Sequence, residues 1–160
     1  MAASAVVRRQ AERTLIFHIP TMTLGERIAM ARRAHRALFP QLIAGRNDMV
    51  LTALLDNPRL IENDLVVLIN TGEPSADFLG EVARHHKWGR FHGVRRAIAE
   101  CPQSPLPLAL SALVQLPRSD QRKLADKADL PDRVRSAAAA LWANGNQARL
   151  LERSGADPTE

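Results

Sequence analysis

The stretch His92-Gly93-Val94-Arg95-Arg96-Ala97-Ile98 decides the fold, because its pattern occurs twice more in the chain. Residues 48–54 and 132–138 share its Val-x-x-Ala core, and the three copies begin 44 and 40 residues apart. Apolar residues three and four positions apart are typical of a helix that buries one face. The recurrence therefore predicts a series of similar helical units.

Two of the copies run into a corner at the same offset. Their corners are Asp56-Asn57-Pro58 and Glu100-Cys101-Pro102, and proline after the corner residue prevents the helix from continuing. Each corner leads to two further predicted helices, over residues 65–69 and 76–86 in one unit and over 108–114 and 120–128 in the other. A period of about 40–47 residues with two or three helices is typical of helical-repeat arrays.

The first long helix has a clear start signal. Thr23 and Glu26 are spaced as a capping box, in which the Thr23 hydroxyl accepts the third amide and Glu26 reaches back. Apolar positions continue at helical spacing from Leu24 to about Leu38, and Pro40 stops the helix there. One helix is therefore expected over residues 24–38, with a further turn up to Gly45.

These units resemble bacterial HEAT-like and armadillo-like repeat proteins from about Gly25 to Trp142, although Cys101 stands where their corner carries Asn. The resemblance implies an all-α, short solenoid of about seven or eight helices. It implies an N-terminal arm over residues 1–22, a repeat domain over 23–144, and a C-terminal helix turn and tail over 145–160. It also implies a bacterial, cytoplasmic scaffold that binds other proteins, and it transfers no catalytic residue.

A rival interpretation concerns residues 65–80, which also resemble the strand, glycine loop and helix that open lipid A disaccharide synthases. Such a loop would place a phosphate or nucleotide at the helix start. However, Ala76 stands where that family needs glycine. Residues 65–69 also align in the repeat with residues 109–113, whose composition favours helix. Helix is therefore the prediction for residues 65–69.

Composition bounds the function classes. The chain has 160 residues, of which 46% are hydrophobic and 24% charged, so a globular domain is expected. One cysteine excludes an internal disulfide framework, and the apolar runs are shorter than the ~18 residues of a membrane span. Lysine and arginine number 22 against 17 acidic residues, and the resulting charge of +5 favours acidic partners.

The residues that carry chemistry are dispersed. His85 and His86 are adjacent, so their side chains point to different faces of a helix and do not readily bind the same metal ion. No Gly-x-Ser-x-Gly nucleophile elbow and no acid–base pair of carboxylates is evident. We therefore expect no catalytic residue, no metal site, no cofactor and no enzymatic activity.

One segment, residues 84–96, contains five basic residues, three histidines and no acid. Cations around an exposed aromatic ring can hold an acidic peptide or a phosphate. The predicted partner-binding residues are Arg84, Lys87, Trp88, Arg90, Arg95 and Arg96. The alternative is that Trp88 packs between helices and that the charges only solvate a helix end.

The expected function is that of a non-enzymatic adaptor, or a subunit of a larger assembly, with an acidic protein partner. The alternative is a basic, nucleic-acid-binding protein, because HEAT-like folds include alkylpurine DNA glycosylases that grip the duplex backbone. A weaker alternative is the sugar-nucleotide enzyme implied by the glycine loop.

Overall fold

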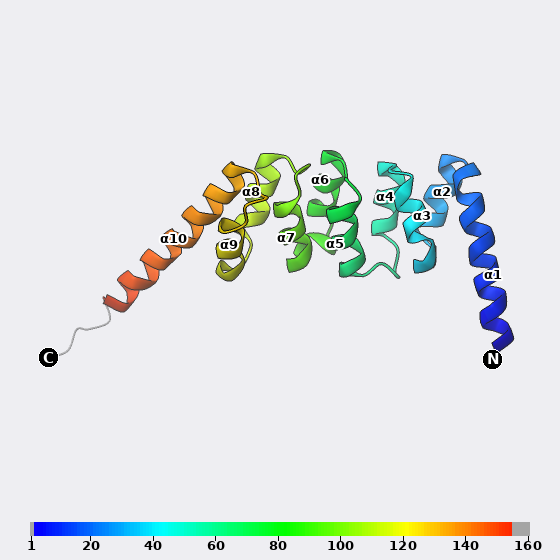
Figure 1. The fold of residues 1–160 in the computed structure, drawn as a ribbon, viewed down its shortest axis with the longest axis horizontal. Coiled ribbons are helices and arrows are strands. Elements are labelled where there is room, and N and C mark those ends of the chain that lie inside the picture. Colours follow the sequence, from blue (N-terminus) through cyan, green and yellow to red (C-terminus); the bar gives the residue numbers. More distant parts are fainter. Residues whose placement is uncertain (1, 155–160) are drawn as a thin grey trace. The chain divides into compact units, whose positions relative to one another are not determined.

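The computed structural model describes residues 2–154 of the chain, with the side chains of residues 5–7 and 10–145 (Figure 1). This part is all-helical and contains no strand, as the repeat pattern predicts. Its first elements are α1 (Ala2–His18), η1 (Ile19–Thr21), α2 (Leu24–Ala31), η2 (Arg36–Leu38), α3 (Phe39–Ala44), α4 (Asp48–Leu55), α5 (Glu62–Thr71) and α6 (Ala76–Arg84). The rest are η3 (Trp88–Arg90), α7 (His92–Glu100), α8 (Leu106–Val114), α9 (Arg118–Ala125) and α10 (Asp132–Ser154).

The predicted count of seven or eight helices is wrong, because the described residues form ten α-helices. One addition is α1, which occupies most of the expected N-terminal arm. Another is α3, which is separate because α2 stops at Ala31 and does not continue to Leu38. The carbonyls of Ala31 and Ala34 accept the buried Nδ2 amide of Asn57, at 2.7 and 3.0 Å. The Asn57 side chain donates to carbonyls that would otherwise accept the amides of a continuing helix. Asn57 therefore ends α2.

The chain divides into two compact units, with the boundary between Gly89 and Arg90. We call residues up to Gly89 unit 1 and residues from Arg90 unit 2, and each is described by itself. Neither expected boundary coincides with this division. The one after residue 144 falls inside α10, and residues 155–160 of the expected tail lie outside the described part.

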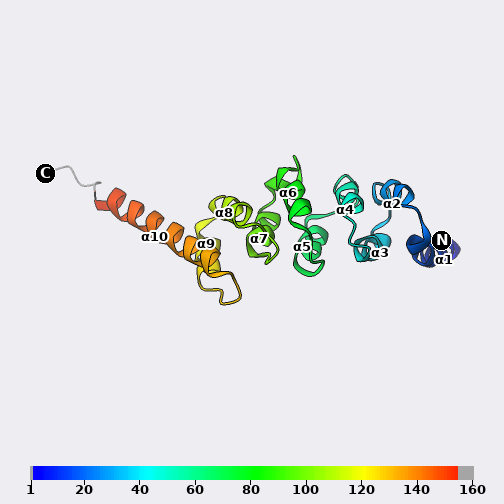
Figure 2. The same ribbon diagram turned by 90° about the horizontal axis from the view of Figure 1, so that it is seen from above.

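Unit 1 is built from alternating helices. Viewed from above, α2, α4 and α6 form one row, and α1, α3 and α5 form the other (Figure 2). Within the first row α2 packs against α4 and α4 against α6, while α3 packs against α2 and α4. The first-row helices begin at Leu24, Asp48 and Ala76, which are 24 and 28 residues apart. The interval in unit 1 is therefore shorter than the 40–44 residues read from the sequence, and it covers two helices.

Polar caps join the first-row helices of unit 1. Asn47 Oδ1 accepts the amides of Met49 and Val50 at the start of α4, at 3.1 and 3.3 Å. Ser75 Oγ accepts the amide of Phe78 at the start of α6 and donates to Asp48 Oδ2, at 3.0 and 2.6 Å. The predicted capping box of Thr23 and Glu26 is confirmed at the start of α2. Each cap satisfies amides that would otherwise lack a partner.

The segment with two interpretations, residues 65–69, is helical and lies inside α5. The strand of the rival interpretation is therefore wrong. Leu65, Leu68 and Ile69 are buried, whereas Val67 is half exposed. Three buried positions on one face and an exposed one between them fit the period of a helix and not the alternation of a strand.

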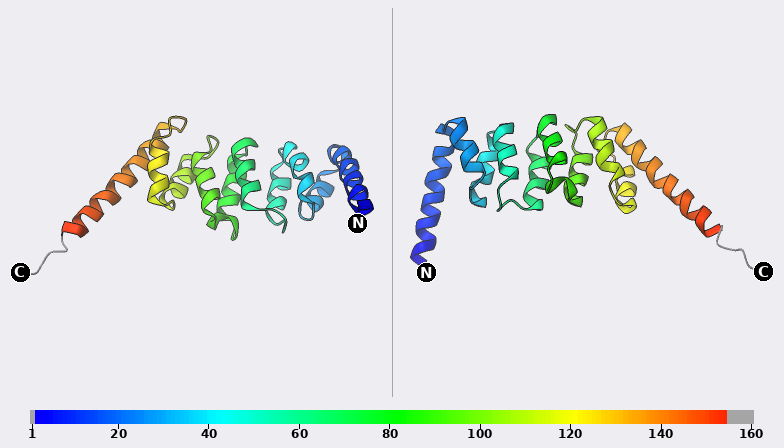
Figure 3. Two further views of the ribbon diagram at one scale, coloured as in Figure 1. Left: turned by 60° about the horizontal axis from the view of Figure 1, so that its bottom comes forward. Right: turned by 180° about the vertical axis from the view of Figure 1, so that it is seen from behind.

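In unit 2, α7 packs against α8, and α10 packs against both α8 and α9. Figure 3 shows α10, coloured orange to red, as the long final helix of this unit. Arg118 ties α9 to α10 by donating from Nη2 to the carbonyl of Trp142, at 2.9 Å. Across the described residues, no helix combines the length and apolar character needed to cross a bilayer.

Candidate functional site

The six predicted partner-binding residues fall into two sets, because the unit boundary passes between them. Arg84, Lys87 and Trp88 belong to unit 1. The other three, Arg90, Arg95 and Arg96, belong to unit 2. Each set is therefore assessed on its own surroundings.

Trp88 is buried, with 1% of its surface exposed. Its indole Nε1 donates to the carbonyl of Leu55 at 2.8 Å, which closes the C-terminal end of α4. The expectation of an exposed aromatic anchor is therefore wrong, and Trp88 packs inside unit 1 as the alternative stated. The ammonium of Lys87 lies over the same ring, 3.9 Å from its centre, at a distance typical of a cation–π contact.

His85 organises the turn that carries Lys87 and Trp88. Its Nδ1 accepts the backbone amides of both residues, at 3.2 and 3.4 Å, so the neutral ring carries its proton on Nε2. Nε2 lies 3.5 Å from Asp56 Oδ1. The preceding residue, Arg84, is exposed and pairs with Glu81 at 2.6 Å. The two predicted cations of unit 1, Arg84 and Lys87, are thus engaged with their own helix and turn.

In unit 2, Arg96 belongs to a larger group that spans α7 and α9. His92, Arg96 and Glu100 lie four residues apart and share one face of α7. They meet Asp120 and Lys123 of α9 and Lys127, which follows α9. We call these six residues the α7–α9 face: His92, Arg96, Glu100, Asp120, Lys123 and Lys127.

Asp120 is the buried centre of the α7–α9 face, with 6% of its side chain exposed. His92 Nε2 contacts its Oδ2, while Lys123 Nζ and Arg96 Nη1 lie 3.6 and 3.9 Å from its Oδ1. A buried carboxylate is costly unless cations and donors surround it. Asp120 therefore orients the cations of Lys123 and Arg96 at the surface.

Glu100 organises the other end of the face. It accepts Arg96 Nε at 2.8 Å and Lys127 Nζ at 2.7 Å. Burial acts to raise the pKa of Glu100, but the hydrogen bonds from Lys127 and Arg96 outweigh it and hold the pKa below its usual value. The hydrogen bond to Glu100 in turn raises the pKa of Arg96. Glu100 is therefore ionised at neutral pH.

The face combines partly exposed cations with one buried carboxylate, Asp120, and one partly buried carboxylate, Glu100. Lys123 is 64% exposed, Lys127 40% and Arg96 39%. These three cations and two carboxylates leave a net charge of +1, without counting His92. Such a surface can donate to carboxylates or phosphates while its own acids keep the cations in place.

Two further predicted residues belong to unit 2. Arg90 is exposed in η3, ahead of α7, and Arg95 is half-buried on α7. Lys123, Lys127 and His92 were missed as site residues. The signal that identifies His92 and Lys127 is a pairing interval: His92–Asp120 and Glu100–Lys127 are 28 and 27 residues apart, and so are Arg36–Asp64 and Arg46–Glu73 of unit 1.

The described residues give little support for metal binding or for catalysis by a nucleophilic side chain. No group of three or more His, Cys, Asp or Glu side chains is placed there to hold a metal ion. Cys101 is buried at the corner after α7, and burial raises the pKa of its thiol. A raised pKa leaves the thiol protonated and weakly nucleophilic at neutral pH.

Comparison of the chain with protein-family models, curated proteins and solved structures finds no match.

Proposed function

We propose that this chain is a non-enzymatic helical-repeat protein that binds an acidic protein partner through the α7–α9 face. The observation that carries the proposal is the pair of carboxylates, buried Asp120 and partly buried Glu100, beside which Lys123, Arg96 and Lys127 lie at the surface. Charged side chains fixed before binding lose less conformational entropy when they engage a partner.

Carboxylates of a protein suit this surface better than a nucleic-acid backbone. Nucleic-acid binding gains most of its affinity from cations that neutralise successive phosphates and release counterions. In the α7–α9 face, internal acids already compensate two of the three permanent positive charges. What remains is a set of directed donors with a weak net field, which matches a few carboxylates at defined positions.

The alternating helices of unit 1 support the same kind of function. Two rows of short helices present broad surfaces, and described exposed apolar side chains include Met49 on α4 and Val67 on α5. We propose a HEAT- or armadillo-like array, a class whose members commonly act as adaptors or as subunits of larger assemblies.

The test begins with affinity capture from the native host, using the full chain as bait, and continues with the purified captured protein. Lys123→Gln removes the most exposed cation of the face. Arg133→Gln removes an exposed cation of α10 in the same unit and serves as the matched control. We expect Lys123→Gln to weaken binding by about 0.5–1.5 kcal/mol, measured by calorimetry, and the control to leave it unchanged. Equal affinities for both variants would overturn the proposal.

A further inference from the structure

The α7–α9 face contains one histidine, the residue type whose charge ordinarily changes between about pH 5 and 8. This residue, His92, begins α7 and has 53% of its side chain exposed. Its Nε2 contacts Oδ2 of buried Asp120, and Lys123 Nζ and Arg96 Nη1 lie 3.6 and 3.9 Å from the other oxygen of the same carboxylate. His92 therefore lies among the cations that we propose for partner binding.

The charged groups around His92 come from α7 and α9. On α9, Asp120 is in contact with the ring and Lys123 lies beside the same carboxylate. On α7, Arg95 and Arg96 follow His92 at the three- and four-residue intervals that share a helix face. The other helix packed against α7 is α8, whose sequence contains no ionisable side chain. Among the described residues, the acid in contact with His92 is thus Asp120 alone.

The two ring nitrogens of His92 differ in their contacts. Nε2 is used by Asp120, whereas Nδ1 has no hydrogen bond or ion pair with any residue that the structure describes. A neutral imidazole that donates from Nε2 carries no proton on Nδ1, and protonation adds a second N–H there. Protonation therefore keeps the contact with Asp120 and creates a donor for a further acid. It also raises the net charge of the face from +1 to +2.

From this geometry we infer that His92 makes acidic-partner binding at the α7–α9 face dependent on pH, with tighter binding when the ring is protonated. The inference rests on the proposed function of that face. A partner carboxylate meets one more cation at pH 6 than at pH 8, and this cation carries a donor that no acid of the chain already uses.

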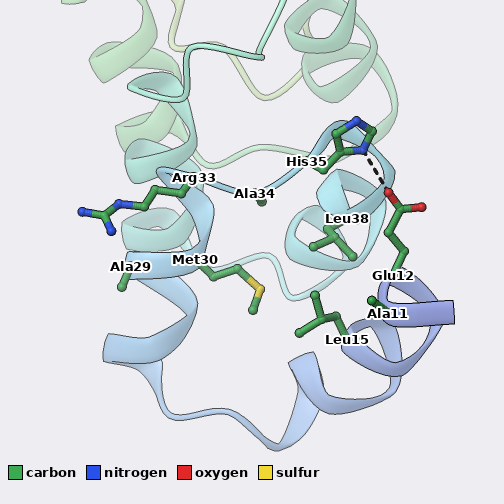
Figure 4. Close-up of a pocket in the computed structure, with 9 residues that line it drawn as sticks. All are labelled: Ala11, Glu12, Leu15, Ala29, Met30, Arg33, Ala34, His35 and Leu38. Carbon is green, nitrogen blue, oxygen red and sulfur yellow. Dashed lines mark ion pairs between the residues drawn. The ribbon is translucent and has the colours of Figure 1, made fainter. Parts of the chain in front are cut away.

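A second histidine of the chain provides a matched control. His35 in unit 1 is also half exposed and pairs with a carboxylate, because its Nδ1 lies 3.3 Å from Glu12 Oε1 (Figure 4). This pair lies outside the α7–α9 face. If protonation of any exposed histidine tightened binding through the overall charge of the chain, His35 would contribute as much as His92.

The direct test titrates the full chain with an acetylated and amidated hexa-aspartate peptide at low ionic strength, followed by NMR chemical shifts. The peptide stays ionised at pH 8 and pH 6, because aspartate ordinarily titrates near pH 4. We expect about 3-fold tighter binding at pH 6 than at pH 8, a size typical of one exposed ion pair. Equal affinities at the two pH values, or no binding at either, would overturn the inference.

Paired variants assign the effect to one ring. His92→Gln retains a side-chain amide that can donate to Asp120 but cannot gain a charge, so the tightening at pH 6 should disappear. His35→Gln should keep the full pH dependence. The same pH dependence in both variants would contradict the assignment to His92.

A permanent cation at the same position gives an independent test. His92→Arg should bind the peptide at pH 8 about as tightly as the unmodified chain binds it at pH 6, because arginine stays charged and has several donors. This variant decides if circular dichroism shows that His92→Gln loses helix. An Arg variant that still binds about 3-fold tighter at pH 6 would overturn the inference.

Lys123→Gln separates this inference from the proposed function. If it binds the peptide at pH 8 as tightly as Arg133→Gln does, the α7–α9 face is not the binding surface, and both proposals fail. If Lys123→Gln binds more weakly but the unmodified chain shows no pH dependence, only the inference about His92 fails.

Discussion

The corners after α4 and α7 carry the same sequence signal and differ in chemistry. In unit 1, Asn57 is buried and makes three hydrogen bonds: its amide donates to the carbonyls of Ala31 and Ala34, and its Oδ1 accepts the amide of Arg59 at 2.8 Å. In unit 2 the equivalent slot holds Cys101, whose thiol lies 3.2 Å from Gln103 Oε1. A thiol is a weak donor and cannot replace a carboxamide that bridges two carbonyls.

In unit 2, a residue at another position donates to the free carbonyls at a helix end. Gln121, in α9, is buried and donates from Nε2 to the carbonyls of Leu113 and Leu116 near the end of α8, at 3.3 and 3.1 Å. In both units a buried carboxamide closes the C-terminal end of a helix. The comparison teaches that the helix end requires a buried side-chain amide as hydrogen-bond donor. A corner residue supplies this donor in unit 1, and a residue of α9 supplies it in unit 2.

The largest effect is expected for Asn57→Ala. It leaves two buried carbonyls and one amide without partners, which should lower the free energy of unfolding of unit 1 by about 3 kcal/mol. Urea unfolding followed by fluorescence measures this, and in a Trp142→Phe background the signal comes from Trp88 of unit 1. Cys101→Ala, read from Trp142 in a Trp88→Phe background, is the matched corner control and should cost about 1 kcal/mol. Equal losses would break the distinction between the corners.

Gln121→Ala should produce the next largest effect. Two carbonyls near the end of α8 lose their donor, and we expect unit 2 to lose about 2 kcal/mol, read from Trp142 fluorescence. Gln115→Ala is the control, because Gln115 Nε2 makes a single exposed hydrogen bond to Ser111. A Gln121 variant as stable as this control would show that the buried carboxamide has no such role in unit 2.

Much of the fold follows from the sequence, and the reason is visible in particular residues. The spacing of apolar residues and the Thr23–Glu26 capping box identified helices and one helix start. The sequence did not show that α2 ends at Ala31, because the partner that ends it, Asn57, lies 26 residues further along the chain. Contacts between distant residues also explain why Trp88 is buried: its partner is the carbonyl of Leu55.

The candidate site was less predictable. Arg96 was identified because it lies in a dense basic segment. The acids that it contacts also pair with Lys123 and Lys127, which lie on a different helix and just beyond it. A local charge count does not show which acids from a later helix will face a given cation. The 27–28-residue pairing interval carries that information, and it differs from the period on which the repeat was read.

A pH-dependent difference is expected between unit 2 and its Glu100→Gln variant. The pKa of Glu100 is lowered in the folded state, so the ionised form contributes stability above the unfolded pKa, and this contribution is lost as pH falls through the folded pKa. Unfolding free energies measured between about pH 5 and 3 should therefore decline more steeply for the unmodified chain. Glu81→Gln is the control and should follow the unmodified chain. Parallel curves for Glu100→Gln and the unmodified chain would contradict this.

The smallest effect concerns the thiol of the second corner. Cys101 is buried and its pKa is raised by burial, so iodoacetamide at pH 8 should modify it at least ~10-fold more slowly in the folded chain than in urea. Mass spectrometry measures both rates. Equal rates would show that the corner after α7 is open to solvent.

The central claim is that the α7–α9 face binds a protein through a few fixed cations. Its most direct test is the salt dependence of binding to the captured partner. The account predicts that affinity falls with salt by a log–log slope of about 1–2, and that Lys123→Gln reduces this slope while Arg133→Gln does not. A slope of about 5 or more, or one that Lys123→Gln leaves unchanged, would contradict it.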